Sequence, residues 1–134
     1  MPSSNKFKLY FLLGFLIVNV FIWHTVFTED RRGMLKVSFL DIGQGDAIFI
    51  EAPNGNQVLI DGGSNKKVLK ELGKVMSFYD RTIDAVIATH PDKDHIGGLI
   101  DVLKNYRADF VMAPGVSSVP GAYQELARWI KDKN

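Results

Sequence analysis

The segment THPDKDHIGG, residues 89–98, places two histidines and two aspartates within six positions and ends in a pair of glycines. Imidazole and carboxylate groups are side chains that bind zinc, manganese and related ions in proteins. The sequence contains no cysteine, so a metal ion held by this chain must bind through nitrogen and oxygen atoms. The segment therefore predicts a metal site.

The spacing of these residues suggests two ions rather than one. Pro91 favours an extended backbone at His90. If the segment stays extended, the side chains of His90, Asp92 and Asp94 project to the same side of the chain. Asp94 and His95 are adjacent and diverge. We therefore expect His90 and Asp92 to hold one ion, and Asp94 and His95 to help hold a second.

The chemistry that requires such a cluster is hydrolysis. Two metal ions about 3.5–4 Å apart lower the pKa of a bound water molecule and hold both the attacking and the leaving oxygen. The metal-held hydroxide would then be the nucleophile, and Asp94 is the candidate catalytic residue that orients it. Either Zn²⁺ or Mn²⁺ suits this ligand set. The alternative is that Asp92 or Asp94 only caps a helix and that the histidines are incidental.

The rest of the chain predicts a mixed β-sheet covered by helices, an α/β (α+β) fold. Period-two alternation, continuous apolar runs and turn residues indicate strands, and apolar residues at helical spacing indicate helices. The expected strands are residues 34–41, 46–52, 57–61, 83–89 and 108–114, and the expected helices are residues 65–76, 97–106 and 122–131.

The metal-binding segment follows the expected strand at residues 83–89, and ligands of α/β sheets collect outside the carboxyl ends of strands. Asp61 ends another strand, where it could orient a ligand histidine or form an Asx-turn before two glycines. Asp46 belongs to the turn GQGD, residues 43–46, which lacks the lysine and third glycine of phosphate-binding loops. Both aspartates are candidates to orient the metal ligands through hydrogen bonds, without binding the metal themselves.

The N-terminal region predicts a membrane anchor. Residues 9–28 carry no formal charge and match the roughly 20 apolar residues that span a bilayer as a helix. A cleavable signal peptide is the alternative, but its apolar stretch is usually about 7–15 residues long. We therefore expect a tail at residues 1–8, a signal-anchor helix at residues 9–28, a linker at residues 29–33 and a domain at residues 34–134.

The overall charge identifies no partner. Lysine and arginine total 16 against 15 acidic residues, so the chain lacks the basic character of domains that bind mainly to nucleic-acid backbones. With 134 residues it has room for about one domain.

Two longer stretches, FLDIGQGDAIFIEAPNGNQVLIDGG at 39–63 and IDAVIATHPDKDHIGGL at 83–99, resemble the metallo-β-lactamase-like domain of ComEC-type competence proteins. The resemblance implies an αββα sandwich with a dinuclear metal site, and a hydrolase that cleaves phosphodiesters, DNA in the competence case. It places His90, Asp92, Asp94 and His95 on the ligand motif H-x-[HD]-x-D-H. Asp92 stands where most of the superfamily has histidine, which favours Mn²⁺ as an alternative to Zn²⁺.

The chain departs from this family in two respects. ComEC-type channels have many membrane spans and this chain has one, so it is not itself a DNA channel. The family also completes its metal site with a histidine and an aspartate from its later half, whereas no histidine follows His95. We therefore expect the first half of the sandwich, with a partner or the missing C-terminal half completing the site.

Together these features predict a single-pass membrane protein with an extracytoplasmic, metal-dependent hydrolase domain and a cytoplasmic N-terminal tail. A phosphodiesterase or nuclease is the leading expectation. The alternatives are a small-molecule hydrolase similar to phosphorylcholine esterases and a non-catalytic, membrane-anchored metal-binding module.

Overall fold

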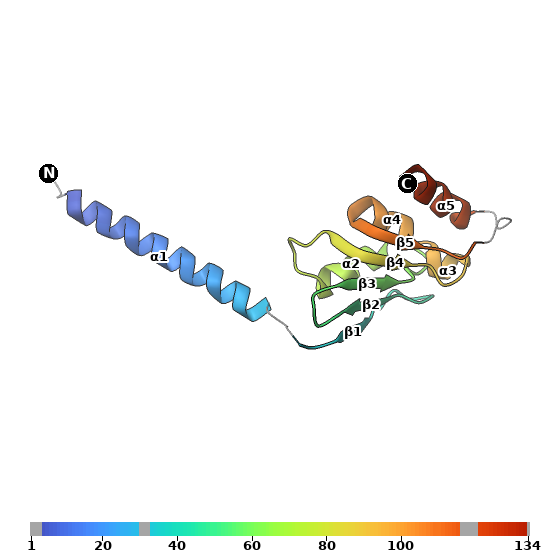
Figure 1. Cartoon of the computed structure of the whole chain (residues 1–134), viewed down its shortest axis with the longest axis horizontal. Helices are drawn as coiled ribbons and strands as arrows, with labels where there is room; N and C mark the ends of the chain where they lie inside the picture. The colour runs from blue at the N-terminus through green and yellow to red at the C-terminus, as the bar shows by residue number, and fades with distance from the viewer. Residues whose placement is uncertain (1–3, 30–32, 116–120, 134) are drawn as a thin grey trace. The chain divides into compact units, whose positions relative to one another are not determined.

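The computed structural model describes residues 4–29, 33–115 and 121–133 (Figure 1). The chain divides into two compact units, Met1–Gly33 and Met34–Asn134. Helix α1 (Ser4–Glu29) belongs to the first unit, and the other described helices and all described strands belong to the second.

Helix α1 contains a segment, Lys6–Val26, that is long and apolar enough to cross a membrane. Two of its polar side chains bond within the helix: Asn19 Nδ2 donates to the Phe15 carbonyl at 2.8 Å, and Thr25 Oγ1 donates to the Phe21 carbonyl at 3.0 Å. Such bonds allow polar residues in an apolar helix without water. A signal sequence near an N-terminus can meet the same criteria of length and composition, so α1 fits a membrane span or a signal sequence.

The second unit alternates strands and helices as the sequence predicts, with one difference. The segment after β4 forms two short helices, α3 and α4, and α3 begins at Lys93, before the predicted start at Gly97. The elements are β1 (Lys36–Phe39), β2 (Ile48–Glu51), β3 (Gln57–Ile60), α2 (Lys67–Val75), β4 (Thr82–Ile87), α3 (Lys93–Ile96), α4 (Leu99–Asn105), β5 (Arg107–Met112) and α5 (Ala122–Lys133).

The strands form one mixed sheet in the order β1-β2-β3-β4-β5. The strands β1, β2 and β3 pair antiparallel in that order, and the short turn that PNGN at residues 53–56 predicts joins β2 to β3. The strands β3, β4 and β5 pair parallel, with α2 connecting β3 to β4 and α3 and α4 connecting β4 to β5. The expected α/β fold is confirmed, and the parallel pairing puts the carboxyl ends of β3 and β4 at the same edge.

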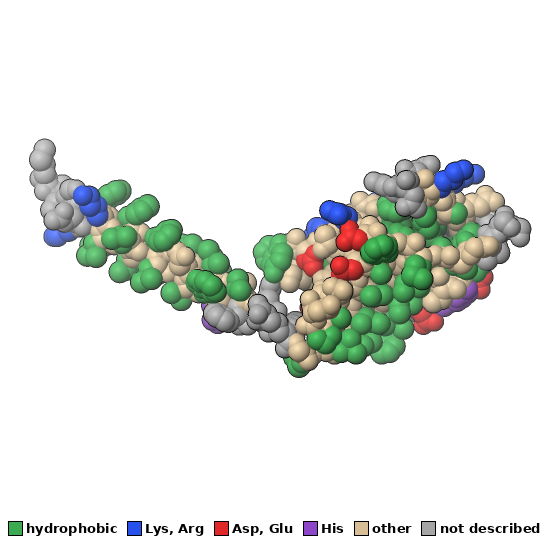
Figure 2. Space-filling model, in the orientation of Figure 1, with side chains coloured by type: hydrophobic (Ala, Val, Ile, Leu, Met, Phe, Trp, Pro, Cys, Tyr) green, Lys and Arg blue, Asp and Glu red, His purple; other side chains and the backbone are tan. Residues whose placement is uncertain are grey.

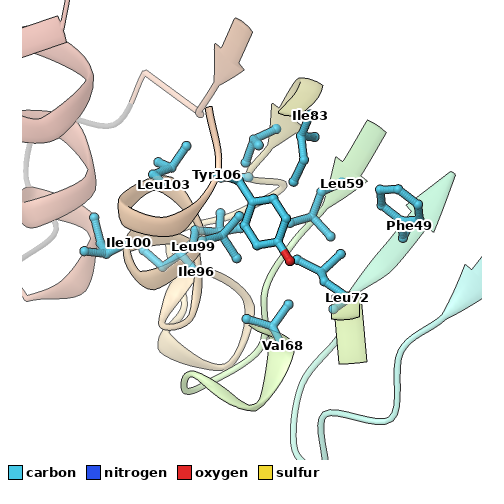
Figure 3. Close-up of a cluster of buried hydrophobic side chains, with 14 of the residues drawn as sticks. Phe49, Leu59, Val68, Leu72, Ile83, Ile96, Leu99, Ile100, Leu103 and Tyr106 are labelled. Atoms are coloured by element: carbon cyan, nitrogen blue, oxygen red, sulfur yellow. The ribbon is translucent and has the colours of Figure 1, made fainter. Parts of the chain in front are cut away.

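Helices cover one face of this sheet and bury a continuous core. Phe49, Leu59 and Ile83 point from the strands toward apolar side chains of α2, α3 and α4 (Figure 3). The side chains from these helices that are fully buried are Val68, Leu72, Ile96, Leu99 and Val102. Full burial of each large apolar side chain stabilises the fold by roughly 1.5–3 kcal/mol.

The turn between α2 and β4 is fixed by one aspartate. Asp80 Oδ1 accepts hydrogen bonds from the backbone and hydroxyl of Thr82, at 3.0 and 2.8 Å, and Oδ2 accepts one from Gln57 Nε2 at 2.6 Å. Burial raises the pKa of Asp80, but these hydrogen bonds and the charge of Arg81 together outweigh burial and lower the pKa below its usual value. The ionised carboxylate thus ties the start of β3 to the start of β4.

The opposite face of the sheet is apolar and has no helix over it in the described part of the chain. Strand register places ten apolar side chains in two rows across all five strands, and none of the ten belongs to the buried core. Figure 2 shows apolar side chains gathered over the strands. The rows are Val37, Ile50, Val58, Ala85 and Phe110, and Phe39, Ile48, Ile60, Ile87 and Met112. We call these ten residues the open face.

The contrast between the two faces predicts unequal effects of truncation. Leu59→Ala removes a side chain that is 0% exposed and should lower the free energy of unfolding by about 2–5 kcal/mol. Phe39→Ala removes a larger side chain that is 79% exposed and should change it by less than about 1 kcal/mol. Urea unfolding of the full chain in detergent micelles measures both, and equal losses would contradict the assignment of the core to the helical face.

Candidate metal centre

Three loops meet at the edge of the sheet where β3 and β4 end. The backbone N–H of Gly62 donates to the carbonyl of His95 at 2.6 Å, and that of Gly63 donates to the carbonyl of Asp46 at 3.0 Å. The N–H of Gly98 returns to the Gly63 carbonyl at 2.9 Å. Backbone hydrogen bonds therefore hold the loop after β3 to the turn at residues 43–46 on one side and to residues 95–98 on the other.

Glycine is required where these loops touch. Gly45 has φ +97°, and a Cβ there would overlap the carbonyl of Asp94. A Cβ at Gly98 would overlap the carbonyl of Gly62. The GQGD segment is thus a turn packed against the metal-binding loop, which explains its glycines without a phosphate ligand.

Asp61 is the buried charge at the centre of this edge. Asp61 is only 3% exposed, and its backbone lies in the left-handed region at φ 58°. Oδ1 accepts the backbone N–H of Thr89 at 2.8 Å. Oδ2 accepts the Thr89 hydroxyl at 2.6 Å and lies 2.9 Å from His95 Nδ1. The sequence left two roles open for Asp61, an Asx-turn or the orientation of a histidine. These hydrogen bonds favour the orientation of His95.

His90 and His95 lie side by side above Asp61. Their ring centroids are 3.7 Å apart, and one potential ligand atom from each of His90, His95 and Asp61 lies within 4.8 Å of the other two. The side chain of His95 is 15% exposed and that of His90 is 42% exposed, so the cluster opens to solvent on the His90 side.

The aspartates predicted as ligands lie around this pair with less definite contacts. Asp92 Oδ2 is 3.7 Å from His90 Nε2, and its carboxylate makes no capping hydrogen bond although it precedes α3. Asp46 Oδ2 is 4.0 Å from His95 Nδ1. Asp94 lies in the first turn of α3. The expectation that His90, Asp92 and Asp94 project together from an extended segment is wrong, because the chain becomes helical at Lys93.

The donor set fits a metal ion. Because Asp61 engages Nδ1 of His95, Nε2 of that ring stays available, and carboxylate-bound histidines of this kind are typical of metal centres. Two ligand atoms of one tetrahedral zinc ion are roughly 3.3 Å apart, given bonds of about 2.0–2.2 Å. The 3.7 Å between His90 Nε2 and Asp92 Oδ2 is close to that value. His90 and Asp92 would therefore need only small movements to bind a common cation.

One contributor was not anticipated from the sequence. Thr89 contacts both Asp61 and His90, with its hydroxyl 2.8 Å from His90 Nδ1. A hydroxyl directly before a candidate ligand at a strand end is a weak signal. Its meaning appears only once β3 and β4 are known to be parallel neighbours, because that pairing brings Asp61 next to Thr89.

Comparison with known proteins gives the class of this fold and site. The model of the metallo-beta-lactamase superfamily matches residues 40–123, which is more than half of the chain. The chain therefore belongs to the metallo-beta-lactamase superfamily, a superfamily of metal-dependent hydrolases. The resemblance inferred from the motifs is confirmed.

Individual relatives match over part of the chain. ComE operon protein 3 of Bacillus subtilis is 33% identical over 96 residues, covering 59% of this chain and 12% of that protein. Human microtubule-associated protein 1S is 43% identical over 67 residues, covering 50% and 6%. Hydroxyacylglutathione hydrolase of Photobacterium profundum is 33% identical over 69 residues, covering 52% and 26%. The chain thus spans about a quarter or less of the length of each relative.

The central position of Asp61 predicts a specific cost for neutralising it. Asp61→Asn keeps the shape of the side chain but replaces an acceptor oxygen with a donor, which leaves buried donors facing each other. We expect the free energy of unfolding to fall by about 1–3 kcal/mol. Asp41→Asn, at a side chain that is 85% exposed, should change it by less than about 0.5 kcal/mol. Equal unfolding curves for the two variants in urea would contradict the role given to Asp61.

Proposed function

We propose that this chain carries the metal-binding half of a phosphodiester hydrolase. The observation that supports the proposal most directly is the pairing of His90 and His95 over the buried carboxylate of Asp61, in a chain of the metallo-beta-lactamase superfamily. The resemblance of its motifs to ComEC-type competence proteins implies a substrate of the phosphodiester class, with DNA as one candidate.

The residues divide the work as follows. His90, Asp92, Asp94 and His95 would hold Zn²⁺ or Mn²⁺, and a complete site would hold two ions. When bound, the metal supplies an activated water and neutralises charge that develops on the substrate oxygens. Asp61 fixes the ring of His95, and Asp94 is placed in the first turn of α3 to orient the attacking group. Asp46 lies beside His95, with its Oδ2 4.0 Å from His95 Nδ1, and would support that ligand.

The N-terminal helix is proposed to anchor the enzyme. Residues 9–28 would cross the bilayer once, with residues 1–8 in the cytoplasm, residues 29–33 as a linker and the domain at residues 34–134 outside. Its uncharged length supports this assignment. The competence relatives suggest the outward orientation of the domain.

The open face is proposed to receive a second β-sheet that completes the sandwich and the metal site. Parallel strands such as β3, β4 and β5 occur in proteins with both faces covered. In the row from Phe39 to Met112, Ile60 directly precedes Asp61 and Ile87 lies two residues before Thr89, so a sheet packed there would bring its own loops near His90. The occupant we propose is the second half of a metallo-β-lactamase-like domain, either following on the same polypeptide or supplied by a partner.

A second candidate function is a metal-binding module without catalysis. One reason is the small number of ligands: the group of potential ligands in the described residues contains only two imidazoles and one carboxylate. The other is the match to a protein named for microtubule association. A small-molecule hydrolase is a further candidate within the superfamily, favoured by the match to hydroxyacylglutathione hydrolase.

The hydrolase proposal predicts metal-dependent turnover. The full chain in detergent micelles, loaded with Zn²⁺ or Mn²⁺, should cleave bis-p-nitrophenyl phosphate, and His90→Ala or Asp94→Ala should reduce the release of p-nitrophenolate to background. The third histidine, His24, lies in α1, so His24→Ala is the matched control and should leave turnover unchanged.

Two outcomes would decide against the proposal. Turnover that is the same in the wild type and in both site variants would exclude this centre as the origin of activity. Zinc bound stoichiometrically with no turnover, alone or with a second half added, would favour the metal-binding module.

The open face generates its own prediction. The later half of the homologous domain of ComE operon protein 3, produced separately, should copurify with this chain and raise its zinc affinity. Phe110→Asp puts a charge on a side chain that is 71% exposed, and should abolish copurification without unfolding the chain. Tyr79→Asp, 62% exposed in the turn before β4, is the control. Association that survives Phe110→Asp would contradict docking on this face.

A further inference from the structure

The hydroxyl of Thr89 bridges the buried carboxylate of Asp61 and the ring of His90. Thr89 Oγ1 lies 2.6 Å from Asp61 Oδ2 and 2.8 Å from His90 Nδ1. Thr89 is itself an exposed residue, but its hydroxyl faces the carboxylate of Asp61, a residue that is only 3% exposed. The hydroxyl therefore has a charged, desolvated acceptor on one side and an imidazole nitrogen on the other.

The direction of each hydrogen bond follows from counting protons. An ionised carboxylate only accepts hydrogen bonds, and a hydroxyl has a single proton to donate. The Thr89 proton goes to Asp61, because a bond to a charged acceptor is stronger and this contact is the shorter one. The Thr89 oxygen must then accept, so His90 carries its proton on Nδ1 and keeps a free lone pair on Nε2.

The same carboxylate sets the second ring directly. His95 Nδ1 donates to Asp61 Oδ2 at 2.9 Å, so Nε2 of His95 is also free of its proton. Both imidazoles thus present Nε2 as a metal ligand, one through a direct bond and the other through Thr89. The side chain of His90 is 42% exposed, and water could bind either ring nitrogen and so allow either tautomer. The hydrogen bond to Thr89 favours one of the two.

We propose that Thr89 is a positioning residue that transmits the charge of Asp61 to His90 and selects the tautomer in which Nε2 of His90 can bind a metal. This deepens the proposed function, since it rests on His90 being a metal ligand. The hydroxyl contributes by holding the ring ready before the ion arrives, an effect that outer hydrogen-bond partners of metal ligands commonly have.

The test compares Thr89→Val, which replaces the hydroxyl with a methyl group of similar size, with Thr89→Ser, which keeps the hydroxyl. Long-range ¹H–¹⁵N spectra of the metal-free full chain in micelles, at a pH where the rings are neutral, report the tautomer of each histidine. We expect the proton of His90 on Nδ1 in the wild type and in Thr89→Ser, and its loss from Nδ1 in Thr89→Val. His95 should keep its proton on Nδ1 in all three proteins.

The affinity for Zn²⁺ gives the second measurement, by competition with a chromophoric chelator. Thr89→Val should weaken binding about 10–100-fold and Thr89→Ser should restore it. Thr82→Val is the matched control, because Thr82 also donates its hydroxyl to an aspartate, Asp80, and should leave tautomer and affinity unchanged. If valine disturbs the fold, Thr89→Ala removes the same hydroxyl without adding a methyl group.

The outcomes separate this inference from the hydrolase proposal. A His90 proton that stays on Nδ1 in Thr89→Val or Thr89→Ala overturns the relay, whatever the chain hydrolyses. A Thr89→Ser variant as impaired as Thr89→Val also overturns it, because packing of the methyl group would then be the cause. Tautomer loss rescued by serine supports the relay even if no phosphodiester is cleaved.

Discussion

The structure of this edge depends on one buried negative charge. Asp61 is almost fully removed from solvent, and three donors from two other segments compensate that burial. A buried carboxylate without such partners is strongly unfavourable, so the loop after β4 and the start of α3 must close around it. The parallel pairing of β3 with β4 makes this possible, because it places Thr89 beside the end of β3.

The arrangement of the two imidazoles follows from that constraint rather than from the histidines alone. Imidazoles on a flexible loop would sample many orientations, and each would lose side-chain entropy on binding an ion. Here hydrogen bonds to Thr89 and Asp61 constrain the two rings, whose centroids are 3.7 Å apart. The glycines at positions 45, 62 and 98 serve the same end, since they let the three loops approach closely enough for their backbones to bond. The open face beside this edge is where we propose that a second β-sheet packs.

Much of this could be predicted from the sequence. Hydrophobic periodicity gave the order of strands and helices, and the crowding of His90 and His95 in one loop indicated the site. Local pattern could not decide what Asp61 does, because an Asx-turn and a bond to a distant histidine look alike in sequence. It also misjudged the geometry around Asp94, where α3 begins earlier than its apolar pattern suggests. Thr89 was missed because its role depends on a strand neighbour 28 residues away.

The most direct test of the account is a crystal structure of the chain soaked with Zn²⁺, with anomalous scattering recorded at the zinc edge. The account predicts an anomalous peak within bonding distance of Nε2 of both His90 and His95, with Asp61 still bonded to Nδ1 of His95. A peak elsewhere, or rings that meet the ion through Nδ1, would contradict it.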